Sequence, residues 1–177
     1  MEKYKFTVKP GRPRNLVLLI VAMIVLGAGT AWAVTTVTST IKFVTDLSVA
    51  TVASPNLGYV KAGVTGTYAL DTTGAVTAGG TGVKEGGVPA AGHYTITGSA
   101  SQAININDGN YVVSGASTPS LARCRYGAGA ETSCTNLNVA APGGGTALFV
   151  GLTVTTSAAG ADNQTDSPKF DLTIVYQ

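Results

Sequence analysis

The feature that most constrains this chain is a hydrophobic periodicity of two, which recurs in short segments. Between residues 35 and 44, Val37, Ser39, Ile41 and Phe43 alternate with threonines and Lys42. Because successive side chains of a strand point to opposite faces, this alternation predicts a strand with one apolar face. Similar β-branched runs occur at residues 47–53, 67–70, 94–97, 104–106, 111–114, 137–140, 147–155 and 170–176. After Ala33 no window of twelve residues shows a convincing helical stripe, so the chain is predicted to be all-β.

Turn residues separate nearly all of these runs. Residues 71–74 (DTTG) and 107–110 (NDGN) are predicted turns, because Gly and Asn tolerate the positive φ of tight hairpins. Seven or more short strands joined by turns are typical of an antiparallel sandwich or barrel. We therefore predict one domain over residues 46–177, an antiparallel immunoglobulin-like β-sandwich without internal repeats.

The first 33 residues have the composition of an export signal. Five cations lie in the first fifteen residues, and residues 16–26 (LVLLIVAMIVL) carry no polar side chain. Ala31 and Ala33 place small residues where a signal peptidase reads, so residues 1–33 are predicted to be a signal peptide cleaved after Ala33. The alternative is a retained anchor, since residues 16–33 could just cross a thin bilayer.

The basicity of the chain belongs to this leader. The sequence carries a formal charge of +2, yet the residues after Ala33 contain six cations and eight anions. Without a basic stripe the domain lacks the electrostatic footprint of a nucleic-acid-binding protein. We expect no nucleic acid as partner and contact with a membrane only through the leader before cleavage.

Cys124 and Cys134 are the only cysteines, and nine residues separate them. That spacing fits neither a C-x-x-C redox motif nor a compact zinc knuckle, so a structural disulfide is predicted for an exported chain. His93 is the only histidine and has no acid close in sequence. One imidazole makes neither a zinc site nor a triad. We expect no catalytic residue, no metal and no cofactor, with a hydrolase built on His93 as the remote alternative.

Several stretches, taken in order, resemble a family of secreted bacterial proteins catalogued as domain of unknown function 4402. The resemblance covers nearly the whole chain after the leader, and the cysteine pair departs from it. It implies an exported β-sandwich without a settled activity. The stretches are residues 47–49, 57–58, 62–63, 66–80 (GTYALDTTGAVTAGG), 91–99 (AGHYTITGS), 103–106, 143–158, 163–164 and 170–176 (FDLTIVY).

The two ends have a second, looser similarity, to chaperone-usher pilins. The closing strand with its penultimate Tyr176 resembles a pilin C-terminus, and residues 34–44 resemble the segment that such pilins insert into a neighbour. The resemblance implies that residues 34–45 form a donor segment presenting Val37, Ile41 and Phe43. Phe170, Leu172, Ile174 and Tyr176 would line or flank the receiving groove. The competing interpretation is that residues 37–44 form the first strand of their own domain.

These observations predict a structural subunit of an extracellular filament or pilus-like fibre at the cell surface, whose partners are other copies of itself. The alternative is a monomeric exported sandwich that acts as an adhesin-like or carbohydrate-binding module.

Overall fold

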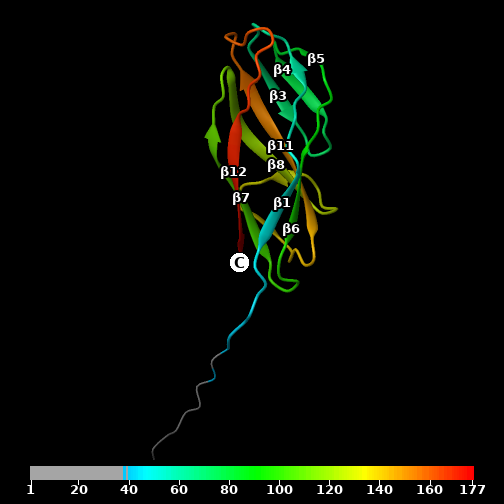
Figure 1. Cartoon of the computed structure of the whole chain (residues 1–177), viewed down its shortest axis with the longest axis vertical. Coiled ribbons are helices and arrows are strands. Elements are labelled where there is room, and N and C mark those ends of the chain that lie inside the picture. Colours follow the sequence, from blue (N-terminus) through cyan, green and yellow to red (C-terminus); the bar gives the residue numbers. More distant parts are fainter. Residues whose placement is uncertain (1–37, 39) are drawn as a thin grey trace, which may run out of the picture. The chain divides into compact units, whose positions relative to one another are not determined.

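The computed structural model describes residue 38 and residues 40–177, of which residues 42–177 pack as one unit (Figure 1). The predicted cleavage site at Ala31 and Ala33 and the predicted donor residue Val37 lie outside the described residues. Within the described part the chain forms strands and turns and no helix. The strands are β1 (Ser48–Ala53), β2 (Tyr59–Val60), β3 (Gly66–Leu70), β4 (Val76–Gly80), β5 (Lys84–Gly86), β6 (Gly92–Thr97), β7 (Ile104–Val112), β8 (Ser117–Tyr126), β9 (Thr132–Ser133), β10 (Leu137–Val139), β11 (Thr146–Thr156) and β12 (Lys169–Tyr176).

The larger sheet is organised around β11. One edge of this strand pairs with β8, while the other edge pairs with β6 along its first half and with β3 along its second half. β1 extends the sheet beyond β6, β4 extends it beyond β3, and β9 borders β8. All of these pairings are antiparallel. The sequence of β11, TALFVGLTVTT, is rich in β-branched and aliphatic residues and lies mostly inside, as a central strand requires.

The second sheet has the order β10-β7-β12. It packs against the part of the larger sheet that is formed by β6, β8 and the first half of β11. Their common core is formed by aliphatic side chains and the buried disulfide between Cys124 and Cys134. The fully buried members are Ile96, Ile104, Ile106, Ala122, Cys124, Cys134, Leu148 and Val150. The predicted all-β sandwich of antiparallel sheets is therefore confirmed, and its two layers are visible in Figure 1.

The alternation of apolar and polar residues predicts the closing strand accurately. In β12 the side chains of Phe170, Leu172, Ile174 and Tyr176 are half-buried, and the residues between them are exposed. Residues 71–74 form the predicted turn, in which Gly74 has a φ of 92°. The Asp71 carboxylate accepts hydrogen bonds from the backbone N–H groups of Thr73 and Ala75. This arrangement is the Asx turn that favours Asp at such positions.

Two sequence predictions are wrong. Residues 107–110 do not form a turn, because β7 continues through them to Val112. The positive φ of Asn110, 48°, occurs where the register with β12 shifts, so the same conformational tolerance produces a β-bulge. Residues 40–44 form no strand, so the interpretation of residues 37–44 as the first strand of their own domain fails for its described part.

β8 was not predicted, although it has ten residues. Its inward side chains include Ser117, Pro119 and Ala122, which are too small or too unlike strand formers to give an alternating apolar signal. Pro119 lies where the register with β11 shifts, as expected for a proline inside a sheet. The strand exists because β11 offers it a complete edge to pair with.

Replacing Gly151 by Ala is expected to destabilise the domain by about 2 kcal/mol or more. A Cβ at this position of β11 would lie 2.2 Å from the Leu70 carbonyl oxygen, and neither backbone can move without disturbing the ladder. Urea denaturation of Gly151→Ala measures the change. Gly109→Ala in β7 is the matched control, because nothing lies within 4 Å of its added Cβ, and its stability should stay near wild type.

Candidate functional site

The candidate site is a groove between two free strand edges. β1 pairs only with β6, and β12 pairs only with β7, so within the described residues each has a second edge without a strand partner. These edges belong to different sheets and border the same hollow, whose volume is about 210 Å³. A sheet edge offers a row of backbone N–H and C=O groups to any extended chain that reaches it. Both edges therefore present backbone groups that pair with no strand of the described residues.

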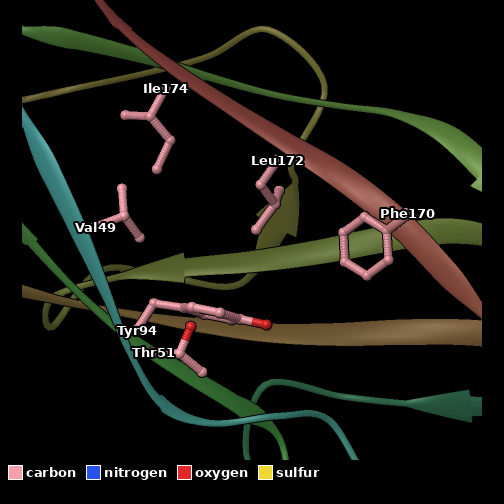
Figure 2. A pocket seen from close by; sticks show the side chains of 6 residues that line it. All are labelled: Val49, Thr51, Tyr94, Phe170, Leu172 and Ile174. Carbon is pink, nitrogen blue, oxygen red and sulfur yellow. The ribbon is translucent and has the colours of Figure 1, made fainter.

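Four of the six side chains that line this groove are apolar, and the other two carry hydroxyl groups. Val49 and Thr51 project into it from β1, and Phe170, Leu172 and Ile174 project into it from β12. Figure 2 shows Val49 facing Ile174 across the groove and Leu172 directed toward the ring of Tyr94. Three of the four predicted receiving residues thus line one hollow. Val49 remains half-exposed, so apolar surface is open to solvent here.

Tyr94 of β6 forms the floor of the groove. Its ring lies between the two edges, with the hydroxyl directed along the groove (Figure 2). It is the cross-strand partner of Thr51, which places both side chains on the same face of the sheet. Burial raises the pKa of the Tyr94 phenol above its ordinary value, so the floor is uncharged at neutral pH.

At the Phe170 end the groove is supported by a hydrogen-bonded tyrosine. The ring of Tyr111 stacks on Phe170 with centroids 5.7 Å apart, and its hydroxyl donates to Asp108. The same hydroxyl accepts the N–H of Ala122 at 2.9 Å, and Thr135 donates to the other Asp108 oxygen at 2.6 Å. These hydrogen bonds link β7 to β8 and to Thr135, and they hold the Tyr111 ring against Phe170 of β12.

The ionisation of this pair follows from the same contacts. Burial, and then the hydrogen bond to Asp108, raise the pKa of Tyr111 to about 12. Burial alone would raise the pKa of Asp108, but the hydrogen bonds from Thr135 and Tyr111 outweigh it and lower that pKa. At neutral pH the pair is a carboxylate bonded to a neutral phenol, which serves packing and leaves no group poised for proton transfer.

At the opposite end, Tyr176 holds the start of the domain in place. Its hydroxyl accepts the N–H of Ser99 at 2.6 Å and donates to the carbonyl oxygen of Thr45 at 2.6 Å. Lys42 donates to Gln102 at 2.7 Å and to the Ser101 carbonyl oxygen at 3.2 Å. We call residues 42–47 the root of the leading segment. These bonds attach it to β12 and to the loop between β6 and β7.

The predicted donor residues that the structure describes are strongly exposed. The side chain of Ile41 is 75% exposed and that of Phe43 is 89% exposed, although both are large and apolar. Residues 40–47 pair with no strand. Ile41 and Phe43 therefore leave apolar side-chain surface open to solvent on a segment that forms no strand.

The other predicted residues have structural places. The Cys124–Cys134 disulfide is buried in the core, where it ties β8 to the segment after β9. His93 stacks on Phe149 at 4.7 Å, and the Arg125 guanidinium lies 4.1 Å from the centre of the same ring. Among residues 40–177 no group of three His, Cys, Asp or Glu side chains is arranged to hold a metal ion, and no helix has the length and apolarity needed to span a membrane.

Comparisons with protein-family models, with curated proteins and with solved structures find no match for this chain. The resemblances noted from the sequence therefore stay predictions. The function has to be inferred from the geometry of the groove and of the leading segment.

Half of the groove was missed by sequence reasoning. Phe170, Leu172 and Ile174 were found because they alternate in a terminal strand, whereas Val49, Thr51 and Tyr94 were not singled out as site residues. Val49 and Thr51 lie in a predicted strand, but nothing local marks that strand as an unpaired edge. Only the pairing of β1 with β6 alone reveals it.

Replacing Tyr111 by Phe is expected to lower the unfolding free energy by about 1–3 kcal/mol, because the buried N–H of Ala122 loses its acceptor. A phenol whose pKa is raised by folding stabilises the native state below pH 10, and this contribution is lost as the pH rises through about 12. Absorbance titration should therefore show a smaller tyrosine ionisation near pH 12 in Tyr111→Phe than in the wild type. Tyr59→Phe, at an exposed site, is the control and should leave both readouts unchanged.

Proposed function

We propose that this protein is a structural subunit of an extracellular filament, in which the leading segment of one copy occupies the groove between β1 and β12 of the next. The observation that carries the proposal is the coexistence in one chain of an open apolar groove and an unpaired apolar segment. The groove has free strand edges without a partner, and the segment has a strand-like side-chain pattern without a sheet to join. The partner is therefore a second copy of the same chain.

The side-chain patterns of the two surfaces match. Ile41 and Phe43 are two residues apart, as are Leu172 and Phe170, so alternate side chains of an inserted strand meet successive positions of the groove. Burying a large apolar side chain contributes about 1.5–3 kcal/mol. Val37, Ile41 and Phe43 together would then give a stable joint.

The backbone groups are also satisfied by this insertion. An extended segment placed between β1 and β12 can pair with the free edge of either strand, which is the β-augmentation mode of peptide recognition. Main-chain hydrogen bonds supply affinity, and the alternate side chains set the specificity. The same insertion would remove the aggregation risk of two exposed edges.

The geometry of such contacts favours a filament. Donor segment and groove are different surfaces of one molecule, so each joint is heterologous and leaves a free segment and a free groove at the two ends. Heterologous contacts propagate without limit unless a ring closes. A homopolymer is the expected product.

Export is part of the proposal. The predicted signal peptide over residues 1–33 would direct the chain out of the cytoplasm, where residues 34–45 become the free leading segment. The disulfide between Cys124 and Cys134 is typical of oxidising compartments such as the cell exterior. A cell-surface location accords with both features.

Blocking either surface is expected to abolish filaments, and mixing the two blocked proteins should restore one joint. Phe43→Asp removes the donor and Thr51→Arg fills the groove from β1, while both retain the buried core. Produced from the whole sequence in an exporting bacterial host, each variant should be monomeric in size-exclusion chromatography. A mixture of the two should yield a heterodimer that grows no further.

The matched controls change a residue next to Thr51 and a residue three positions before Phe43. Val52→Arg in β1 changes an exposed side chain that does not line the groove, and Thr40→Asp changes the opposite face of the leading segment. Both should still form filaments visible by negative-stain electron microscopy. Wild-type protein that remains monomeric at all concentrations, with the groove variants indistinguishable from it, would leave a solitary exported sandwich and reject the filament.

A further inference from the structure

We propose that the Cys124–Cys134 disulfide completes one wall of the groove, so that a chain binds a donor strand tightly only after oxidation. The inference rests on the proposed function and adds a condition on when the groove can be filled. Two hydrogen bonds and one ring stack connect the residue after Cys134 with Phe170, which lines the groove. Oxidation in the core therefore acts on the groove through specific contacts.

The disulfide holds the segment that passes from the larger sheet to the second sheet. Cys124 belongs to β8, and Cys134 follows β9 and precedes β10, with both side chains fully buried in the common core. Apart from the disulfide, the described structure ties this segment to β8 by the short ladder of β9 and by the N–H of Cys134, which donates to the Ala122 carbonyl oxygen at 3.3 Å. So short a ladder gives little stability by itself. The position of residues 134–136 thus depends largely on the disulfide.

Thr135 transmits this position to Tyr111 through Asp108. The Thr135 hydroxyl, next to Cys134 in the chain, donates to one oxygen of the Asp108 carboxylate at 2.6 Å. The other oxygen of the same carboxylate accepts the hydroxyl of Tyr111. A carboxylate bonded at both oxygens cannot turn without breaking a hydrogen bond. The orientation of Asp108, and with it that of the phenol, is therefore set by Thr135.

Tyr111 supports the wall of the groove at Phe170. The two rings stack with centroids 5.7 Å apart, and the Tyr111 hydroxyl also accepts the N–H of Ala122 at 2.9 Å. Without the bond from Thr135, the Asp108 carboxylate is free to turn toward solvent, and the Tyr111 hydroxyl keeps only its contact with Ala122. An inserted strand would then have to order this wall as it binds. Ordering at the moment of binding lowers the affinity.

The oxidation itself is a thiol–disulfide exchange. The two cysteine thiols lose two protons and two electrons as the S–S bond forms, and an external disulfide takes up the electrons and is reduced to two thiols. Because Cys124 and Cys134 have no exposed surface, the exchange must precede closure of the core, and reductants do not reach the bond in the folded protein. Cytosolic thiols stay reduced. Copies of the chain would therefore remain unjoined until the proposed export.

The test compares two proteins whose own donor is blocked, so that the groove is free. One is Phe43→Asp, and the other carries Cys124→Ala and Cys134→Ala in addition. Both are produced from the whole sequence in an exporting bacterial host, and the probe is a synthetic peptide covering residues 34–44. We expect the folded variant without the disulfide to bind this peptide about fivefold more weakly, which corresponds to the loss of one hydrogen bond.

A second readout reports on the contact path rather than on overall stability. Burial and the hydrogen bond to Asp108 together raise the pKa of Tyr111 to about 12, and the contribution of Asp108 is lost when this carboxylate is released. Absorbance titration of the variant without cysteines should therefore show a smaller tyrosine ionisation near pH 12 than titration of Phe43→Asp.

Thr135→Val breaks the path and keeps the disulfide. In the Phe43→Asp background it should weaken peptide binding and reduce the ionisation near pH 12 as the loss of the cysteines does. Added to the variant without cysteines, it should change neither readout further, because the two changes act on one path.

Thr72→Val is the matched control, since it loosens the same disulfide loop on its other side. The buried Thr72 donates its N–H and its hydroxyl to Glu131 at 2.8 Å, and Arg125 donates to its carbonyl oxygen at 3.1 Å. Arg125 lies on the face of β8 opposite to Cys124, so these contacts do not lead to the groove. This variant should unfold more easily but keep the peptide affinity and the tyrosine titration of Phe43→Asp.

Equal peptide affinity with and without the disulfide would overturn the inference, and so would a Thr72→Val protein that loses as much affinity as the variant without cysteines. If the latter fails to fold, Thr135→Val decides, and unchanged affinity with an unchanged titration is the contrary result. Failure of Phe43→Asp itself to bind the peptide would reject the proposed function instead. The titration would then still show whether the disulfide fixes Tyr111.

Discussion

The structure depends on how the backbone of a two-layered sheet is satisfied at its edges. β11 pairs on both sides along most of its length, and this central position organises the larger sheet. Among the residues that the structure describes, β1 and β12 have no such neighbour on one side. Each free edge is tolerable alone, yet here two of them border the same apolar hollow. That combination is what makes the groove a candidate for strand insertion.

The groove is rigidly supported, which would favour the proposed insertion of a strand. Phe170 is held by the stacked ring of Tyr111, whose hydroxyl is fixed by Asp108 and the Ala122 N–H. At the other end Tyr176 is bonded to Ser99 and Thr45. A preformed groove loses little conformational entropy on filling, so more of the burial energy of the donor appears as affinity. The buried disulfide adds to this rigidity by tying β8 into the core.

Much of the fold was accessible from local patterns, and the errors have identifiable causes. The strands with regular alternation, such as β12 and β11, were predicted within a residue or two. β8 was missed because its inward side chains are small, and the bulge at Asn110 was taken for a turn because both need the same backbone conformation. On the site, sequence found the wall on β12 but neither the wall on β1 nor the floor at Tyr94.

Sequence alone determined the all-β class, the disulfide partners and the alternating faces of β12, because each follows from side-chain type and spacing along the chain. Only the tertiary structure decided which strands are edges, since pairing is a relation between segments far apart in the chain. It also decided that residues 40–44 remain outside the sheets, although their alternation suits a strand as well as that of β12 does. A strand pattern states what a segment can bury, but the available neighbour determines whether it is buried.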